Sequence, residues 1–571
     1  MKKNISKIFA GPDENIRSVI KRLTKGKEED PSIPPGITLV VDKKEKLLGI
    51  VTNGDLRRAF ASGIKLDDPI SRVMNKKPSV IVADDSANIL PTLFAKIKAG
   101  EWPKNRLEKI LVVDNGNRVV DLVSFYDLVH TSDVRFKHIG VLGLGYVGLT
   151  LGLTLADLGF KVRGFDINPS VLKALEKGRA HFYEEGLKDL IDDNLGKNFS
   201  VAADFSGANN CDVYFVAVGT PIGKNGVPNL DLVRSAAETI GKVLKSGDAV
   251  ILRSTVPLGT TRNVVTPVLE KQSGLKAGED FLVAFAPERT IEGKALEELR
   301  HLPQVIGGIN QASTDLVSNI FNVMTKSTVL VDSLESAEMV KLINNVYRDV
   351  TFGFSNEISL VAQRWGIDTT KVIEAANYGY TRSNIPLPSP GVGGYCLEKD
   401  PFIFIQSAKE KGYEPHMAKH ARAVSDRMID EISKDVLAFM KKHKKDNKKA
   451  KILALGVAFK GKPQTSDLRG STALKILQKL QEAKFTNIHA YDPAVFEKEL
   501  IQRNIKYVAT PEAGFRDADA VLVMNNNPIF ENLKIRNLLK LSKNPTLLFD
   551  GWSMFNTEEI SKINGVTHKR L

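Results

Sequence analysis

The sequence has 571 residues, which at roughly 150 residues per domain predicts about four domains and excludes a small module with one core. Apolar residues make up 42% and charged residues 26%, a balance that excludes a disordered chain or a fibre. The net charge is +13, but seven lysines and one aspartate fall between residues 441 and 451. Because no aromatic residues interrupt this run, we predict a solvated basic linker and no nucleic-acid partner.

Cysteine content and hydropathy restrict the class of protein. The two cysteines, Cys211 and Cys396, lie far apart, which excludes a disulfide framework and a structural zinc site. No apolar segment follows the first lysines, so we expect no signal peptide and a cytoplasmic protein. The uncharged stretch from Ile139 to Ala156 has the length of a membrane span, but its five glycines favour a phosphate-binding turn. We therefore expect no membrane span.

The first 133 residues contain an internal repeat with an offset of 72 positions. Val40-Val41-Asp42 aligns with Val112-Val113-Asp114, and residues 51–56 align with residues 123–128. Each copy reads as a strand, a polar turn, a second strand and a helix preceded by a Thr or Ser cap. We expect two equal halves packed as a pseudo-twofold pair.

The segments GIVTNGDLRRAF and MNKKPSVIVADDS resemble a cystathionine β-synthase (CBS) domain pair. In that family a Thr/Ser-x-x-Asp element usually holds an adenosine ribose, and the matching residues here are Thr52, Asp55, Ser124 and Asp127. A carboxylate can accept hydrogen bonds from both ribose hydroxyls, so the resemblance implies a regulatory site for AMP or ATP. The alternative is that these aspartates only cap helices and the pair only folds and dimerises.

A dinucleotide-binding pattern begins at residue 138. An apolar strand runs into Gly143-x-Gly145-x-x-Gly148, then a helical stretch, then a second strand that ends at Asp166. Gly143 allows the tight turn, Gly145 lets backbone amides approach a pyrophosphate, and Gly148 allows close packing of helix and strand. Asp166 would bind ribose hydroxyls and repel a 2′-phosphate, which predicts NAD as the cofactor. The cofactor-binding residues predicted in this segment are Gly143, Gly145, Tyr146, Val147, Gly148 and Asp166.

The remaining pattern predicts two further units. Strands at residues 213–218, 249–253 and 282–284 alternate with helical stretches, as a doubly wound sheet requires. Residues 336–366 carry apolar positions three and four apart, which predicts a long amphipathic helix, typical of a hinge or a dimer interface. A second strand-led unit starts at residue 452. The predicted fold class is α/β, with two Rossmann-like doubly wound domains joined by a long helical hinge and preceded by an α+β CBS domain pair. The predicted boundaries are 1–133, 134–335, 336–440 and 441–571.

Cys396 lies in a loop suited to chemistry. It follows Gly393 and Gly394 and precedes Lys399 and Asp400. Glycines let the backbone approach a ligand, and a nearby ammonium group favours the thiolate over the thiol. We therefore predict that Cys396 is a nucleophile, whereas Cys211, at the start of an apolar strand, is a core residue.

The chain from about residue 137 to 571 resembles the nucleotide-sugar 6-dehydrogenases, the family of UDP-glucose, UDP-N-acetylhexosamine and GDP-mannose dehydrogenases. Eight separated motifs carry the resemblance. They are the GxGxxG turn, Val218-Gly219-Thr220-Pro221, Ser254-Thr255-Val256-Pro257, Ala286-Pro287-Glu288-Arg289, Glu338-x-x-Lys341-x-x-x-Asn345, Gly393-Gly394-Tyr395-Cys396-x-x-Lys399-Asp400, Gly456-Val457-Ala458-Phe459-Lys460 and Asp467-x-Arg469-x-Ser471.

The resemblance implies oxidation of a sugar C6 alcohol to a carboxylate with two NAD molecules in succession. Cys396 would attack the aldehyde formed first, giving a thiohemiacetal and then a thioester that water cleaves. Lys341, Asn345 and Asp400 match positions that handle protons and stabilise oxyanions. Glu288 and Thr255 resemble the pair that positions the hydrolytic water and the cofactor. The resemblance assigns further residues to NAD, namely Gly219, Thr220, Pro221, Ser254, Glu292, Lys399 and Arg469. It assigns to the UDP sugar Arg289, Thr290, Gly393, Phe459, Lys460 and, from across a dimer, Arg382.

Two features point to different branches of the family. Arg289 and the segment 296–299 resemble enzymes of N-acetylhexosamines, whereas Tyr395 and Lys399 resemble the glucose branch. We expect a UDP-N-acetylhexosamine (GlcNAc or ManNAc) as substrate, with UDP-glucose as the alternative. A non-catalytic nucleotide-sugar sensor is a further alternative, opposed by the complete set of catalytic residues.

A glycine in the C-terminal segment and a pair of histidines lead to two further expectations. Gly470 stands where the common pattern has Glu, which puts one contact of the C-terminal domain in doubt. His416 and His420 are four apart on a predicted helix, but no third ligand is evident, so we expect no metal site. We expect a homodimer or a higher homo-oligomer.

Overall fold

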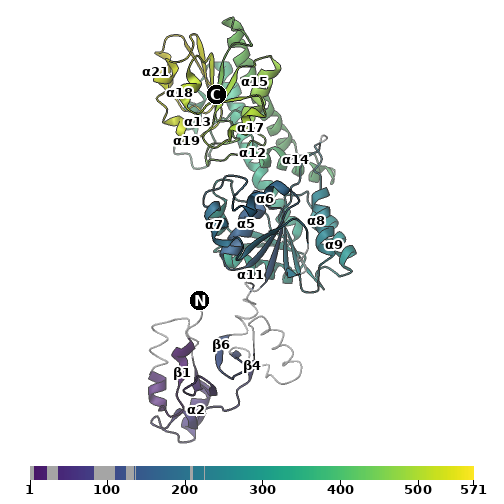
Figure 1. The fold of residues 1–571 in the computed structure, drawn as a ribbon, viewed down its shortest axis with the longest axis vertical. Helices are drawn as coiled ribbons and strands as arrows, with labels where there is room; N and C mark the ends of the chain where they lie inside the picture. Colours follow the sequence, from purple (N-terminus) through teal and green to yellow (C-terminus); the bar gives the residue numbers. More distant parts are fainter. Residues whose placement is uncertain are drawn as a thin grey trace. The chain divides into compact units, whose positions relative to one another are not determined.

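The computed structural model describes residues 5–21, 36–82, 110–123, 134, 137–205, 210–223 and 226–571. The chain divides into two compact units, Met1–Phe136 and Lys137–Leu571, each of which is described by itself (Figure 1). Ser124 and Asp127 of the predicted nucleotide site lie outside the described residues.

The first unit contains two three-stranded sheets of the same topology, in the orders β1-β2-β3 and β4-β5-β6. In each sheet the first strand pairs parallel with the second, and the second pairs antiparallel with the third. The strands are β1 (Phe9–Ala10), β2 (Ile37–Val41), β3 (Leu47–Thr52), β4 (Val80–Val82), β5 (Ile110–Val113) and β6 (Val119–Val123). The helices with described bounds are η1 (Ile5–Ile8), α2 (Asn53–Ala61) and η2 (Ile70–Arg72), and residues 16–21 are also helical.

The structure confirms the repeat with an offset of 72 positions. Asp42 and Asp114 each accept two backbone N–H groups from the turn that follows them. The β2–β3 and β5–β6 pairs also share an irregularity of register at the same point of the repeat. Leu39 and its counterpart Leu111 lie in one buried cluster, so the two halves share a hydrophobic core.

The second unit begins with an eight-stranded sheet in the order β14-β13-β12-β11-β10-β7-β8-β9. All neighbouring strands are parallel except β12 and β13, so the sheet is mixed. Its strands are β7 (His138–Leu142), β8 (Lys161–Phe165), β9 (Phe199–Ala202), β10 (Val213–Val216), β11 (Ala249–Leu252), β12 (Leu282–Phe285), β13 (Gln304–Gly308) and β14 (Thr328–Val331). Its helices are α5 (Tyr146–Asp157), α6 (Pro169–Glu176), α7 (Leu187–Asn194), α8 (Asp231–Gly241), the π-helix η6 (Thr261–Val265), α9 (Thr266–Ser273), α10 (Ala295–His301) and α11 (Gln311–Met324).

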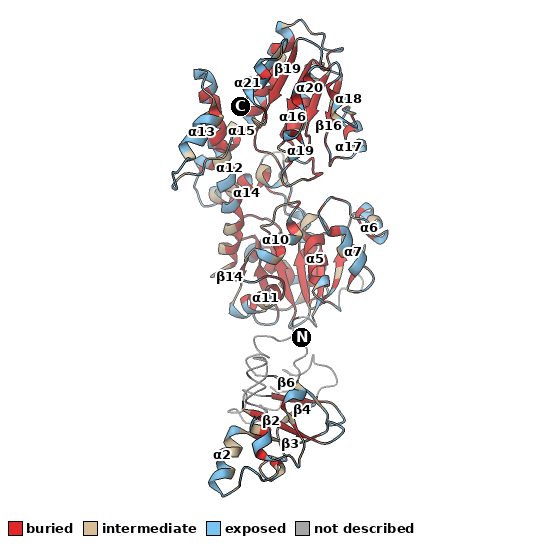
Figure 2. Ribbon diagram, turned by 90° about the vertical axis from the view of Figure 1, so that its left-hand side faces the viewer, coloured by how far each residue is buried: buried red, intermediate tan, exposed pale blue. Residues whose placement is uncertain are grey.

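The uncharged stretch from Ile139 to Ala156 consists of strand β7 and helix α5. Both are largely buried, since α5 packs against β7 and β8 of the sheet and against the helices α7 and α10 (Figure 2). Within the described part of the chain, no helix combines the length and the apolar character needed to cross a membrane.

A second sheet lies at the C-terminal end of the chain. It has six parallel strands in the order β17-β16-β15-β18-β19-β20, with buried central strands (Figure 2). Its strands are β15 (Ile452–Leu455), β16 (Ile488–Tyr491), β17 (Lys506–Tyr507), β18 (Ala520–Val523), β19 (Thr546–Asp550) and β20 (Val566–Arg570). Its helices are α16 (Thr472–Glu482), α17 (Glu497–Ile501), α18 (Pro511–Phe515), α19 (Pro528–Glu531), α20 (Ile535–Leu539) and α21 (Thr557–Ser561).

An aspartate at the end of the second strand of each Rossmann-like domain supports the turn after the first strand. Asp166 accepts the N–H of Leu144, and Asp492 accepts the N–H groups of Val457 and Ala458. Asp492 is only 4% exposed, so the surrounding protein encloses it. The orders β9-β8-β7-β10-β11 and β17-β16-β15-β18-β19 are equivalent and are typical of a Rossmann fold, so the two domains share this strand order and also this polar contact.

The 32-residue helix α12 (Leu334–Trp365) links the two sheets. It begins after the cap Ser333 and ends at Gly366, which adopts the left-handed conformation. The helix packs against β13 and against α14 (Tyr395–Lys409) and α15 (His416–Lys442), and α13 (Thr369–Asn377) follows it. The predicted long helix is thus confirmed, with both ends within two residues of the expected bounds.

The basic run is only partly the solvated linker that we predicted. Helix α15 continues to Lys442, and most of the later lysines are exposed. The side chain of Lys445, however, is only 9% exposed and pairs with Asp519 at 2.7 Å. Asp519 also accepts the N–H of Lys451 at 2.9 Å, so this aspartate fixes the run to the start of the second sheet.

Candidate active site

The first part of the site is the glycine turn between β7 and α5. Gly143 has a φ of +89°, which favours glycine. A Cβ atom at position 148 would lie 1.8 Å from the carbonyl oxygen of Gly143, so only glycine fits there. A Cβ at position 145 would meet no atom within 4 Å, so this side of the turn is open. The open side leaves room for a pyrophosphate at the helix N-terminus.

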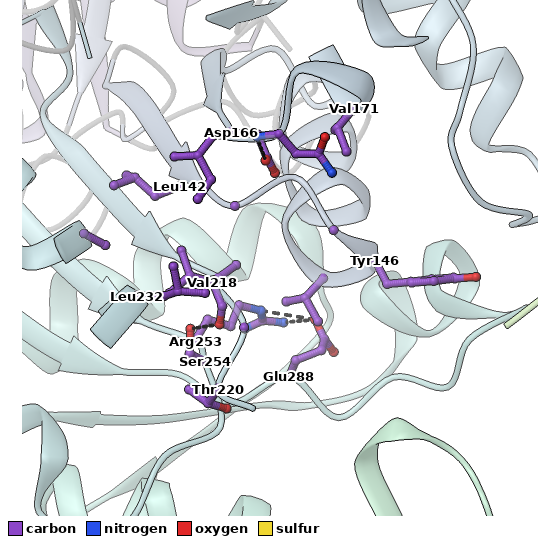
Figure 3. A pocket seen from close by; sticks show the side chains of 18 of the residues that line it. Leu142, Tyr146, Asp166, Val171, Val218, Thr220, Leu232, Arg253, Ser254 and Glu288 are labelled. Atoms are coloured by element: carbon purple, nitrogen blue, oxygen red, sulfur yellow. Dashed lines mark hydrogen bonds and ion pairs between the residues drawn. The ribbon is translucent and has the colours of Figure 1, made fainter. Parts of the chain in front are cut away.

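Asp166 lies beside this turn at the end of β8. Its Oδ2 accepts the N–H of Leu144 at 2.7 Å, and its Oδ1 accepts the N–H of Asn168 at 2.8 Å. Figure 3 shows its side chain at the wall of a cavity, on the same side as Leu142. A carboxylate oxygen has more than one lone pair, so Asp166 can also accept a ribose hydroxyl.

Two loops that follow β10 and β11 are tied to each other. The Ser254 hydroxyl donates to the carbonyl oxygen of Val218 at 2.7 Å (Figure 3). The Thr220 hydroxyl donates to the carbonyl oxygen of Thr255 at 2.7 Å. These bonds join two loops that lie at the carboxyl ends of parallel strands, where doubly wound sheets bind ligands.

Arg253 and Glu288 form a buried ion pair below these loops (Figure 3). Arg253 Nη2 donates to Glu288 Oε2 at 2.6 Å, and its Nη1 donates to the Ala286 carbonyl oxygen at 3.0 Å. Burial acts to raise the pKa of Glu288, but Arg253 and the backbone hydrogen bond from Thr290 outweigh it and leave this pKa low. Arg253 was not among the site residues predicted from the sequence, although a charged residue directly after an apolar strand was a signal for it.

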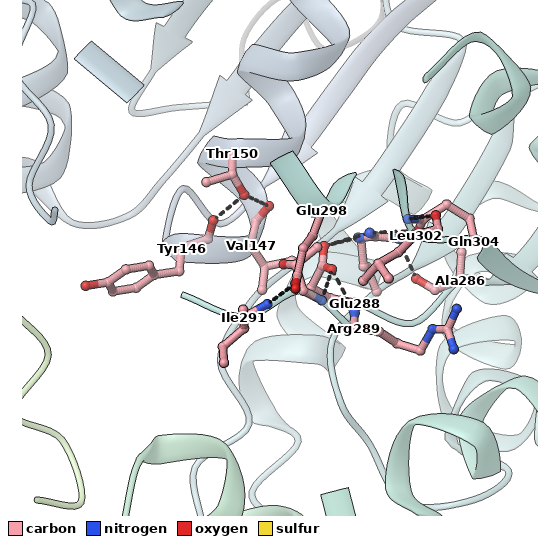
Figure 4. A network of polar contacts seen from close by, with 12 residues as sticks. Tyr146, Val147, Thr150, Ala286, Glu288, Arg289, Ile291, Glu298, Leu302 and Gln304 are labelled. Carbon is pink, nitrogen blue, oxygen red and sulfur yellow. Dashed lines mark hydrogen bonds and ion pairs between the residues drawn. The ribbon is translucent and has the colours of Figure 1, made fainter. Parts of the chain in front are cut away.

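The loop after Glu288 is held at both ends (Figure 4). Glu288 Oε1 accepts the N–H groups of Arg289 and Thr290 at 2.7 and 2.8 Å. Glu298 on α10 accepts the N–H of Ile291 at 2.7 Å. Residues 296–299, which resemble enzymes of N-acetylhexosamines, thus help to hold the loop that brings Thr290 and Glu292 to the cavity.

The nucleophile candidate lies at the N-terminus of α14, next to α12. Asp400 is fully buried between Asn345 Nδ2, at 2.5 Å, and Lys399 Nζ, at 2.7 Å. Cys396 and Lys341 both line the cavity. The structure therefore brings together the cysteine, two lysines, an amide and a carboxylate that the sequence placed on two separate segments.

The C-terminal domain closes the other side of the site. Lys460 Nζ donates to the carbonyl oxygen of Glu292 at 2.7 Å, and the Arg469 guanidinium lies 4.5 Å from the centre of the Tyr395 ring. Burial and then the nearby Asp467 raise the pKa of Glu292 to about 7. Among the described residues, Glu292 Oε2 is buried without a hydrogen-bond partner. Such an atom is suited to bind a ligand or a water molecule.

A single cavity of about 720 Å³ joins the dinucleotide turn to Cys396. The predicted site residues that line it are Gly143, Gly145, Tyr146, Val147, Asp166, Gly219, Thr220, Ser254, Thr255, Glu288, Thr290, Glu292, Lys341, Cys396, Lys399 and Arg469. The predicted residues that do not line it are Gly148, Pro221, Arg289, Asn345, Arg382, Gly393, Asp400, Phe459 and Lys460. The Arg289 guanidinium donates to the Pro303 carbonyl oxygen. Arg382 instead lines a groove of about 1210 Å³ beside α12 and α15.

In the first unit, Thr52 and Asp55 form a capping box at the start of α2. Asp55 Oδ2 accepts the N–H and the hydroxyl of Thr52, at 2.8 and 2.7 Å, and Asp55 Oδ1 accepts Arg58 Nη2 at 2.6 Å. This arrangement is the capping alternative considered from the sequence.

Comparison with known proteins covers most of the chain. Three models of the UDP-glucose/GDP-mannose dehydrogenase family match in order, the NAD binding domain at residues 137–325, the central domain at 335–427 and the UDP binding domain at 453–557. The chain belongs to this family. A CBS domain model matches residues 1–62. The dehydrogenase is therefore an NAD-dependent oxidoreductase of nucleotide sugars, and the predicted family, fold class and cofactor are confirmed.

Similar proteins come from archaea and bacteria. The UDP-N-acetyl-D-mannosamine dehydrogenase of Pyrococcus horikoshii is 32% identical over 417 residues, covering 72% of this chain and 94% of the relative. The UDP-N-acetyl-D-glucosamine 6-dehydrogenase of Pseudomonas aeruginosa is also 32% identical, covering 72% and 96%. The solved structure of UDP-D-ManNAc dehydrogenase from P. horikoshii has a TM-score of 0.69 at 29% identity and covers 76% of this chain and 98% of that one.

One expectation about the dehydrogenase's cysteine needs correction. We expected the neighbouring ammonium groups to favour the thiolate of Cys396. Cys396 is accessible from the cavity, but its pKa is raised, first by the protein that surrounds it and then by the Asp400 carboxylate. Lys341 and Lys399 act in the opposite direction and do not outweigh these effects, since Lys399 pairs with Asp400. A raised pKa favours the thiol form of Cys396 over the thiolate. Cys211 is a buried core residue.

Proposed function

We propose that this dehydrogenase oxidises the C6 alcohol of a UDP-N-acetylhexosamine to the carboxylate in two successive steps at Cys396. The observation that carries the proposal is the single cavity that joins the dinucleotide turn to Cys396, Lys341 and Lys399. The two relatives described above are named for UDP-N-acetylhexosamines, which supports this substrate over UDP-glucose.

The residues around the turn fit NAD because the turn is open at Gly145 and Asp166 lies beside it. NAD, when bound, supplies the hydride acceptor in each oxidation. Ser254, Thr220 and Glu288 shape the loops at the carboxyl ends of the strands. Tyr146 begins helix α5 and stacks on Phe182 with ring centres 3.8 Å apart, which helps to exclude water from the turn.

The first oxidation removes a proton from the C6 hydroxyl group and a hydride from C6, which leaves an aldehyde. Lys341 lines the cavity and donates a hydrogen bond to the developing oxyanion. Asn345 and Lys399 hold the buried Asp400 carboxylate, which in turn fixes Lys399 at the wall of the cavity, and the released proton passes to water in the cavity.

The second half of the reaction proceeds through Cys396. The S–H group adds across the aldehyde C=O, so that sulfur bonds to C6 and the proton ends on oxygen; the neutral thiol thus needs no separate base. Loss of a hydride from C6 and of the hydroxyl proton gives the thioester. Water then cleaves the C–S bond, which gives the carboxylate and restores the thiol. Glu292, with a pKa of about 7 and an unpaired Oε2, accepts a proton from this water.

The first experiment is to supply NAD with UDP-N-acetylglucosamine, UDP-N-acetylmannosamine, UDP-glucose or UDP-galactose and to count the NADH formed per sugar consumed. Two NADH with an N-acetylhexosamine supports the proposal. Two NADH with UDP-glucose alone would replace the proposed substrate by the alternative. If none of the four sugars yields NADH, the proposal fails in favour of the sensor alternative.

We also propose that α12 forms a homodimer interface. Tyr347 is 71% exposed and Trp365 is 77% exposed on this helix, and both are apolar enough to favour a partner surface. The groove that holds Arg382 lies on the same part of the chain, which supports the expectation that this arginine reaches the site of a second copy. Light scattering of the full chain in solution would measure the mass.

The CBS domain match supports a site for AMP or ATP in the first unit. Binding there has to displace or extend the hydrogen bonds of the Thr52–Asp55 capping box. Calorimetric titration of the full chain with AMP and with ATP tests this, with Asp55→Asn as the variant that loses an acceptor charge. If neither nucleotide binds, only the capping role remains.

A further inference from the structure

The C-terminal domain directly contacts the helix turn that carries Cys396. The N–H of Gly394, which precedes helix α14, donates to the carbonyl oxygen of Gly470 at 3.0 Å. Next to Gly470, the Arg469 guanidinium lies over the Tyr395 ring. The position of the first turn of α14 therefore depends on residues 469 and 470 of a different domain.

Gly470 is also the position where this sequence departs from the common family pattern. A Cβ atom there would lie 2.5 Å from Glu398 Oε2 and 3.1 Å from the carbonyl carbon of Gly394. The φ of Gly470 is +65°, a second reason for glycine. The Glu398 carboxylate thus fills the space in which a side chain at position 470 would begin.

Glu398 belongs to α14, two residues after Cys396, and its Oε1 forms an ion pair with Lys475 Nζ on α16. Helix α16 is part of the C-terminal domain. The pair therefore joins the nucleophile's helix to the domain whose family model is the UDP binding domain.

We infer that Glu398 is a positioning residue for Cys396. It supplies from α14 the carboxylate that the common pattern carries at position 470, and through Lys475 it fixes the first turn of α14 to the C-terminal domain. The inference rests on the proposed role of Cys396 as the nucleophile. A partly exposed ion pair adds little to the stability of a protein of this size, but a small displacement of a reacting group is costly. The effect should therefore appear in kcat rather than in thermal stability.

The chain offers a matched control on the same helix. Lys479 lies one turn after Lys475 and pairs with Asp430 at 2.9 Å, with a side-chain exposure of 44% against 43% for Lys475. Asp430 belongs to α15, not to α14. Lys479→Met removes a comparable ion pair without touching the turn of Cys396.

The test uses full-length Glu398→Gln, Lys475→Met, the reversed pair Glu398→Lys with Lys475→Glu, and Lys479→Met. We expect Glu398→Gln and Lys475→Met to lower kcat about fivefold with KM within about twofold of the parent. The reversed pair should recover at least half of the loss on a logarithmic scale, and Lys479→Met should match the parent. The inference is overturned if Glu398→Gln retains the parent kcat within about twofold, or if the reversed pair is no better than the single variants.

A second measurement does not need turnover. The rate of alkylation of Cys396 by iodoacetamide, followed by mass spectrometry with buried Cys211 as the internal reference, reports on the packing of this turn. We expect Glu398→Gln to alkylate at least about threefold faster than Lys479→Met. An equal alkylation rate in the two variants would overturn the inference about Glu398. This result can be obtained even if the parent enzyme oxidises none of the sugars supplied, so failure of the inference is distinguishable from failure of the proposed function.

Discussion

Arg253 Nη2 lies 2.6 Å from Glu288 Oε2 at the floor of the cavity, and both side chains are almost completely enclosed by protein. The pair connects strand β11 to the loop that carries Thr290 and Glu292.

Arg253→Met should destabilise the protein strongly. It leaves the Glu288 carboxylate buried without its cation, and breaking a buried ion pair costs about 3–5 kcal/mol. The free energy of unfolding from urea titration measures this loss. Arg253→Met combined with Glu288→Gln should lose less than the single variant, since no uncompensated charge remains; an equal loss would contradict the explanation.

The low pKa of Glu288 predicts a pH dependence of stability. A carboxyl group whose pKa is lower in the folded than in the unfolded state stabilises the protein above its unfolded pKa, near 4.5, and loses this contribution as the pH falls further. The difference in melting temperature between the parent and Glu288→Gln should therefore shrink from pH 6 to pH 3. A difference that stays constant over this range would show that Glu288 is not ionised in the fold.

Cys396→Ala should stop the reaction after the first oxidation. Without sulfur the aldehyde cannot form a thioester, so the yield should fall from two NADH per sugar to at most one. Cys211→Ala, at a buried core position, is the control and should keep the yield of two. Two NADH from the Cys396→Ala enzyme would exclude the covalent route.

Glu292 predicts the acidic limb of the pH profile. With a pKa of about 7, its carboxylate form increases as the pH rises from 6 to 8, so kcat should rise over this interval. Glu292→Gln should lower kcat about 100-fold and remove this limb. Glu297→Gln, an exposed carboxylate on α10, should preserve both the rate and the profile.

Gly145 and Gly148 should respond differently to the same substitution. Gly148→Ala places a methyl group 1.8 Å from a carbonyl oxygen and should unfold the turn, lowering the melting temperature. Gly145→Ala meets no protein atom, so the melting temperature should stay the same while NAD binds about tenfold more weakly. Calorimetric titration with NAD and thermal unfolding separate the two effects; unchanged NAD affinity in Gly145→Ala would place the pyrophosphate elsewhere.

Local patterns were sufficient to predict the fold class. Strands such as Ile452–Leu455 are continuously apolar, and the helix Leu334–Trp365 is long and periodic. The cluster around Cys396 could also be anticipated, since its members lie in recognisable motifs. Arg253 could not, because its partner Glu288 is 35 positions away and only the sheet brings them together. The raised pKa of Cys396 was missed for the same reason, since the pairing of Lys399 with Asp400 depends on side-chain geometry rather than on spacing.

Asp166 and Asp492 support equivalent turns in the two Rossmann-like domains, but Asp166 lines the cavity whereas Asp492 is only 4% exposed. Asp166 is therefore the position to substitute in order to change the cofactor preference, although the chain contains two Rossmann-like domains. Substituting Asp166 should change the proposed contact with a ribose. The same substitution at Asp492 should remove the acceptor that holds Val457 and Ala458 and disturb the neighbouring Phe459 and Lys460. Of these two equivalent aspartates, Asp166 is available to a ligand, whereas the hydrogen bonds of Asp492 hold the protein's own backbone.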